Sequence, residues 1–244
     1  SNCRWHLVGT SGTLWVMTSS FEDYLQWRCQ LDDPELELDL SHAGLVEADL
    51  EALRPAFERA LVAMRELEEG AIANPDEDRM VGHYWLRSPG RAPEPGMQDA
   101  IVDTLAAIEV FARDIHADGK FRQVVVCGIG GSALGPMLVA DALDGPNARM
   151  SIHVLDNTDP AGVDRLLARL GDLTETLILT ISKSGTTPEP RNSMLEMQRA
   201  CASQGLAFAE RAIAVTEEGS ALWQRAEEEG WLAVFPMWDW VGGR

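Results

Sequence analysis

From residue 123 onward, short apolar runs alternate with segments in which apolar residues recur at helical spacing. The runs cover residues 123–127, 151–155, 176–182, 211–216 and 233–236, and they are rich in β-branched and aliphatic side chains. Uninterrupted runs of this kind are typical of strands buried on both faces of a parallel sheet. Because helical segments separate them, we predict an α/β fold, a doubly wound five-stranded parallel sheet of flavodoxin-like type.

Upstream of the sheet the periodicity is helical. Apolar residues recur along residues 45–69 at helical spacing: Leu50, Leu53, Phe57, Leu61 and Met64. We expect Pro55 to divide this segment into a short turn and a longer helix, because proline removes a backbone donor and clashes with the preceding turn. Residues 98–117 form a second amphipathic pattern. The sequence therefore predicts an N-terminal helical extension over residues 17–120, followed by the sheet domain over residues 121–244.

The first 16 residues show no clear period. They lack a convincing apolar core and cleavage site, which argues against a signal peptide. Met17 can be the true start, with residues 1–16 then a translated leader or the end of a fused partner. A divergent extension is the other interpretation, and the sequence leaves both open.

A loop rich in hydroxyl groups follows the third predicted strand. Four hydroxyls and Lys183 lie between Ser182 and Thr187. Gly185 permits a turn with positive φ, while Thr187 can cap a helix that begins at Pro188. Because free N–H groups at a helix N-terminus bind anions, the pattern favours a phosphate cradle over an ordinary strand-to-helix turn.

A glycine-rich loop over residues 128–136 follows the first predicted strand, before a helical stretch over residues 137–143. Its glycines permit close approach of a ligand to the backbone, and Ser132 supplies a hydroxyl. Gly128, Gly130 and Ala133 also satisfy a dinucleotide fingerprint, with Asp156 where a ribose-binding acid could lie. The loop alone leaves a sugar-phosphate site, a nicotinamide site and a plain βα turn open. At the end of the second strand, residues 156–159 indicate an Asx-type cap before Pro160 rather than a metal site.

Four motifs occur in the order seen in glucose-6-phosphate isomerases, which the chain resembles over most of its length. They are VGHYWLR at residues 81–87, GIGGS at 128–132, SKSGTT at 182–187 and VGGR at 241–244. The resemblance implies the first of two sugar-isomerase (SIS) domains in an enzyme that interconverts glucose 6-phosphate and fructose 6-phosphate, in glycolysis and gluconeogenesis.

The resemblance also implies roles for individual residues. The substrate-binding residues it points to are Gly131, Ser132, Ser182, Lys183, Ser184, Thr187 and Gly243. Arg244 would steady the negative charge of a cis-enediolate while a proton moves between adjacent carbons of the opened sugar. The resemblance implies no cofactor, no metal and a homodimer at full length. It assigns no role to His83.

The chain stops before the positions where the family carries its glutamate base, ring-opening histidine and second lysine. We therefore expect a fragment that holds the phosphate-binding loops and is inactive alone. A non-catalytic sugar-phosphate-binding SIS module is the alternative. A nicotinamide-dependent oxidoreductase ranks last, because the hydroxyl-rich loop has no purpose in it.

Composition agrees with an acidic, cytoplasmic protein. A formal net charge of −19 disfavours nucleic acid and anionic lipid as partners. No apolar run is long enough to span a membrane. The four cysteines show no metal-binding spacing, so we expect reduced thiols.

Overall fold

The computed structural model describes residues 4–8, 14–18, 20–33, 35–143, 145 and 148–242. The chain divides into two units, Ser1–Met64 and Arg65–Arg244.

The first unit contains two antiparallel hairpins as well as helices. Strand β1 (Arg4–Val8) pairs with β2 (Leu14–Thr18), and β3 (Arg28–Asp32) pairs with β4 (Glu35–Asp39). The short helix α1 (Phe21–Trp27) begins with a capping box, in which the Ser20 hydroxyl and the Asp23 carboxylate each accept a backbone N–H. Residues 17–120, which we expected to be helical, thus also contain the strands β3 and β4, which we did not predict.

Helix α2 (Glu47–Glu68) runs without a break through Pro55. The expected division at this proline is therefore wrong. The proline forgoes one backbone hydrogen bond to the preceding turn, but the residues around it are mostly good helix formers and carry the helix on either side. No residue of α2 is buried, so its apolar stripe is exposed.

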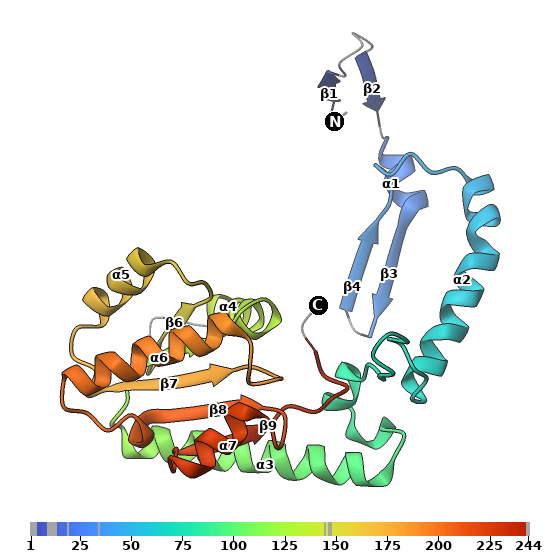
Figure 1. The fold of residues 1–244 in the computed structure, drawn as a ribbon. Helices are drawn as coiled ribbons and strands as arrows, with labels where there is room; N and C mark the ends of the chain where they lie inside the picture. The colour runs from blue at the N-terminus through green and yellow to red at the C-terminus, as the bar shows by residue number, and fades with distance from the viewer. Residues whose placement is uncertain are drawn as a thin grey trace. The chain divides into compact units, whose positions relative to one another are not determined.

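The second unit holds a five-stranded parallel sheet in the order β6-β5-β7-β8-β9 (Figure 1). Its strands are β5 (Gln123–Cys127), β6 (Ser151–Leu155), β7 (Thr176–Ile181), β8 (Ala212–Thr216) and β9 (Ala233–Pro236). Each lies within a residue of its predicted bounds. The order is the flavodoxin-like one, so the predicted fold class is confirmed.

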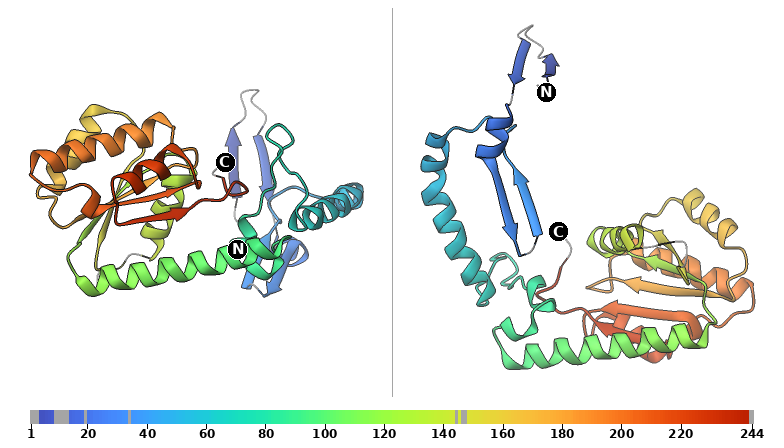
Figure 2. Two further views of the ribbon diagram at one scale, coloured as in Figure 1. Left: turned by 60° about the horizontal axis from the view of Figure 1, so that its bottom comes forward. Right: turned by 180° about the vertical axis from the view of Figure 1, so that it is seen from behind.

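Helices α3 (Pro95–Asp118), α4 (Gly131–Leu143), α5 (Pro160–Leu170), α6 (Pro188–Ser203) and α7 (Ala221–Glu228) accompany the sheet. The main core packs α5, α6 and α7 against one face, where Val125 and Ile178 are fully buried. Helix α3 covers the other face, through Phe111 against Phe235 (Figure 2). Both faces are buried, which explains why the strands are apolar throughout.

Short 3₁₀ turns complete the unit: η1 (His83–Leu86), η2 (Pro89–Arg91) and η3 (Ala209–Arg211). Asp159 caps α5 by accepting the N–H groups of Ala161 at 3.2 Å and Gly162 at 2.9 Å. The expected Asx-type cap before Pro160 is therefore confirmed.

Candidate functional site

Strands β5 and β7 lie side by side, with Cys127 opposite Thr180. The chain leaves β5 for a neighbour on one side and returns to β7 on the other, so the crevice between them is the switch point at which open α/β sheets bind ligands. A pocket of about 470 Å³ opens there and is lined by both loops. The structure thus brings Gly131 and Ser132 together with Ser182, Lys183 and Thr187.

The glycine-rich loop is shorter than predicted. Helix α4 begins at Gly131, not at residue 137, and continues through Pro136. Gly130 turns the chain with φ +52°, and its carbonyl accepts the N–H groups of Ala133 and Leu134, which starts the helix. Gly131 and Ser132 therefore lie in the first turn of a helix, and the Ser132 N–H donates to the Ile129 carbonyl at 3.0 Å.

The hydroxyl-rich loop folds around Ser184. Its Oγ accepts the Thr186 N–H at 3.3 Å and the Thr186 hydroxyl at 3.1 Å, and it lies 3.5 Å from Thr187 Oγ1. Gly185 has φ +68°, as its turn requires. Thr187 is the N-cap residue of α6 and Pro188 its first residue, as predicted, but the Thr187 side chain makes no capping hydrogen bond. Its hydroxyl therefore faces Ser184 instead of the helix.

Ser182 places a buried hydroxyl group in the wall of the pocket. The residue is 6% exposed, and its Oγ has no hydrogen-bond partner in the described part of the chain. A buried hydroxyl without a partner costs free energy comparable to a lost hydrogen bond. Because Ser182 lines the pocket, a ligand there can supply the missing partner.

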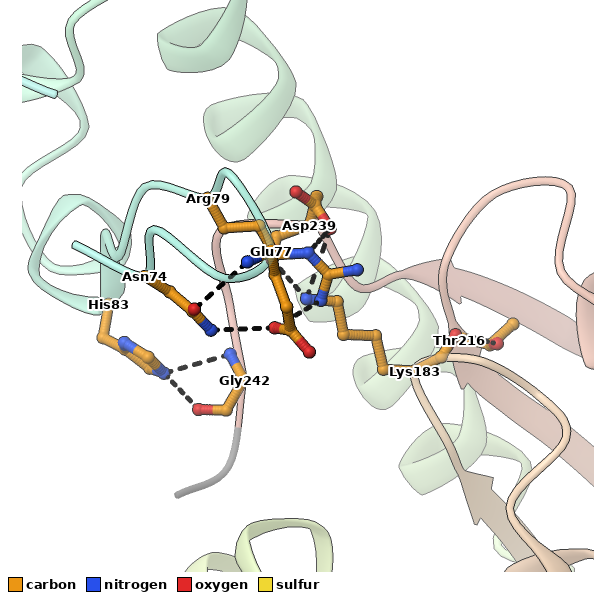
Figure 3. Close-up of polar contacts among 8 residues, drawn as sticks. All are labelled: Asn74, Glu77, Arg79, His83, Lys183, Thr216, Asp239 and Gly242. Atoms are coloured by element: carbon orange, nitrogen blue, oxygen red, sulfur yellow. Dashed lines mark hydrogen bonds and ion pairs between the residues drawn. The ribbon is translucent and has the colours of Figure 1, made fainter. Parts of the chain in front are cut away.

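The side chain of Lys183 is anchored at the pocket wall. Its Nζ donates to the main-chain oxygen of Asp239 and lies 3.5 Å from Asp239 Oδ1 (Figure 3). Its carbonyl accepts the Thr216 hydroxyl at 3.1 Å, which fixes the backbone. Arg79 reaches the same carboxylate, Nε to Oδ1, at 2.9 Å. Two cations therefore share Asp239 at the pocket wall.

A segment upstream of the sheet forms the opposite wall of the pocket. Asn74 and Arg79 pair in a tight turn, and Asn74 Nδ2 donates to Glu77 at 2.9 Å. His83 follows, with its Nε2 against Gly242 (Figure 3). Nothing in the sequence pointed to Arg79 and Asp239 as site residues, because their pairing joins positions far apart in the chain.

Two of the predicted site residues, Gly243 and Arg244, lie outside the described residues. The described chain contains no cluster of histidine, cysteine or acidic residues able to hold a metal ion. None of its helices combines the length and the apolar character needed to cross a bilayer.

Comparison with known proteins decides the family. The family model described as phosphoglucose isomerase matches residues 39–244. The chain belongs to this family. A glucose-6-phosphate isomerase of Thermosynechococcus vestitus is 52% identical over 232 residues, which cover 92% of this chain and 44% of the relative. One of Synechococcus elongatus is 54% identical over 234 residues, with the same two shares.

A solved phosphoglucose isomerase family structure supports the fold assignment. The crystal structure of a glucose-6-phosphate isomerase from Chlamydia trachomatis superimposes with a TM-score of 0.79 at 29% identity, over 92% of this chain and 44% of that one. The parallel sheet is therefore of the sugar-isomerase type, as the motifs indicated. The chain spans 44% of the length of these relatives.

Proposed function

We propose that the pocket between the β5 and β7 loops binds glucose 6-phosphate or fructose 6-phosphate. In this proposal the chain supplies the phosphate-binding part of an aldose–ketose isomerase. The names of its relatives support the substrate class, and the arrangement of the two loops supports the location.

The unpartnered Ser182 hydroxyl carries this proposal. It lies in the pocket wall beside Lys183 and close to the N-terminus of α6. Thr187 also lines the pocket, and its hydroxyl lies 3.5 Å from that of Ser184, an exposed residue that is not itself in the pocket lining. A phosphate dianion offers acceptors for such donors, and the α4 and α6 N-termini add partial positive charge.

Local geometry has to supply the affinity, because the formal net charge of −19 repels an anion at long range. Screening limits that repulsion to about 8 Å at physiological ionic strength. Hydrogen bonds made inside the pocket are screened less, so the hydroxyls and Lys183 outweigh the distant acidic surface.

Proton transfer is proposed to use groups outside this chain. The two carboxylates that line the pocket, Glu77 and Asp239, are each engaged by Arg79, and Asp239 also by Lys183. Both carboxylates are thus already paired with cations at the pocket wall. By resemblance, Arg244 steadies the enediolate charge, and a glutamate elsewhere in the enzyme moves the proton. A non-catalytic sugar-phosphate-binding module has the same pocket and differs only in lacking that base.

Titration of the 244-residue chain tests the binding step. Fructose 6-phosphate should shift the backbone amide NMR signals of residues 130–132 and 182–187 saturably, while NAD should leave them unchanged. The double variant Ser184→Ala, Thr187→Ala should bind at least about tenfold more weakly, since hydrogen bonds to a charged group contribute about 1.5–3 kcal/mol each.

Ser203→Ala is the matched control, because Ser203 lies at the far end of α6 and its hydroxyl donates to the Ala200 carbonyl. It should bind like the wild type. Unchanged affinity in the double variant would refute the phosphate assignment, and a response to NAD alone would favour the oxidoreductase interpretation.

A further inference from the structure

Two segments that are distant in the sequence lie against each other beside the pocket. The Gly82 N–H donates to the Trp240 carbonyl at 3.1 Å, and the rings of Trp85 and Trp240 meet edge-on at 5.3 Å. Both tryptophans are buried in a small core of their own. The segment that starts at Gly82 therefore packs against the chain that follows β9 and holds it in place.

His83 extends this support to Gly242. Its Nε2 lies 2.6 Å from the Gly242 carbonyl oxygen and 3.2 Å from the Gly242 nitrogen, across 159 positions of sequence (Figure 3). One ring nitrogen serves one of these groups at a time: protonated it donates to the oxygen, and unprotonated it accepts the N–H. The shorter distance is that of donation to the carbonyl.

The histidine side of the contact is rigid. A methyl group added at Gly82 would lie 1.9 Å from Trp85 Cε3, so the backbone before His83 is pressed against the buried indole. Trp85 is fixed in turn by donating from Nε1 to the Glu68 carbonyl at 3.1 Å. The base from which His83 projects thus has little freedom.

The Gly242 side lacks such packing. A methyl group added there would meet nothing within 4 Å. Among the described residues, both hydrogen-bond contacts of Gly242 are with His83. The preceding turn is closed by the Val241 N–H donating to the Trp238 carbonyl at 3.0 Å, which leaves His83 to fix the backbone beyond it.

We propose that His83 is a positioning residue, whose Nε2–H holds the Gly242 carbonyl and so orients the backbone that leads into Gly243 and Arg244. This inference rests on the proposed function, because the role that it serves, charge stabilisation by Arg244, is part of that proposal. His83 and Gly242 both line the pocket. A cation aimed at a developing negative charge is effective only when its geometry is fixed in advance.

Wild-type NMR spectra test the contact directly. Long-range ¹H–¹⁵N spectra of the imidazole should show a proton on Nε2 of His83. The heteronuclear NOE at Gly242 should match that of Val241. An unprotonated Nε2 would overturn the proposal.

Substitutions then test the positioning role. Glutamine can place an amide nitrogen where Nε2 stands, whereas asparagine is one methylene shorter. We expect His83→Gln to keep the Gly242 NOE and His83→Asn and His83→Ala to lower it. His116→Gln, at the exposed end of α3, is the control and should change nothing at Gly242. Equal NOE values in all His83 variants would overturn the proposal.

Ligand titration separates this inference from the proposed function. Inorganic phosphate should bind the His83 variants within about twofold of the wild type, while the shift that fructose 6-phosphate causes at Gly242 should be lost in His83→Asn and kept in His83→Gln. A Gly242 shift that survives in His83→Asn would overturn the positioning role. If fructose 6-phosphate shifts no signal of either loop in the wild type, the proposed function is refuted. The His83 tautomer and the Gly242 NOE still decide whether His83 holds Gly242.

Discussion

Gly185 lies where the hydroxyl-rich loop packs against the start of α7. Its φ is +68°, and a methyl group added there would lie 2.5 Å from the backbone nitrogen of Leu222 and 2.9 Å from Leu222 Cβ. Gly205 has nearly the same φ, +70°, but a methyl group there would meet nothing within 4 Å. Alanine at either position would therefore bear a similar backbone strain, and at Gly185 its methyl group would also overlap α7.

The pair predicts two separate costs. Alanine in the left-handed region costs about 1–2 kcal/mol, offset by about 0.4–1 kcal/mol of unfolded-state entropy, so Gly205→Ala should destabilise by about 1 kcal/mol. Gly185→Ala bears the same strain and adds about 1–3 kcal/mol of overpacking. The contact cannot be relieved cheaply, because Leu222 is buried and the Ser220 hydroxyl that caps α7 accepts the Trp223 N–H at 3.1 Å.

Urea unfolding followed by far-ultraviolet circular dichroism measures the difference. With m about 2–3 kcal/mol/M, the midpoint of Gly185→Ala should fall about 0.3–1.5 M below that of Gly205→Ala, at an unchanged m. Binding of fructose 6-phosphate should weaken in Gly185→Ala alone, because the cradle has to shift. Equal midpoints for the two variants would refute the claim that α7 fixes the loop.

Three further predictions use other parts of the second unit. Gly82→Ala should destabilise by about 2–4 kcal/mol in urea unfolding, since its methyl group would overlap buried Trp85, whereas Gly90→Ala, with open space around it, should cost less than about 1 kcal/mol. Burial raises the pKa of the Cys127 thiol to about 12, so iodoacetamide at pH 8 should label exposed Cys29 and spare Cys127. Labelling of Cys127 should rise only as the pH climbs from 9 toward 12. Prompt labelling of Cys127 at pH 8 would contradict its burial. Leu138 is 70% exposed, so Leu138→Glu should change the free energy of unfolding of the 244-residue chain by less than about 0.5 kcal/mol, and a loss above about 1.5 kcal/mol would show that the side chain is packed.

The strands of the sheet were predictable because their signal is local. Five apolar runs, each bounded by polar or glycine-rich loops, correspond to β5 through β9 almost residue for residue. The hairpin β3–β4 was missed although both strands alternate polar and apolar residues, because each strand offers only two apolar positions and both strands stay largely exposed. The start of α4 was missed because Gly135 and Pro136 suggest a loop, although a helix tolerates them here.

The residues of the candidate site also differ in whether a local sequence pattern reveals them. Ser182, Ser184 and Thr187 could be found because they follow one strand within a single loop. Arg79 and Asp239 could not, because neither position carries a local pattern and only the folded chain brings them together. The sequence thus indicated the hydroxyl-rich loop, and it left out the set of charges, Arg79 and Asp239, that holds Lys183 in place.

That set of charges bears on how Lys183 can serve an anion while it is already paired. Asp239 is exposed, so removing one of its two cations costs less free energy than it would for a buried pair. Asp239 is not left alone, because Arg79 holds the same oxygen at 2.9 Å, closer than Lys183 Nζ at 3.5 Å. If Lys183 turns toward a bound phosphate, Asp239 therefore keeps a counter-ion, and the exchange costs less than breaking an isolated pair. Arg79 lies outside the hydroxyl-rich loop, yet through Asp239 it sets how easily the lysine of that loop becomes available.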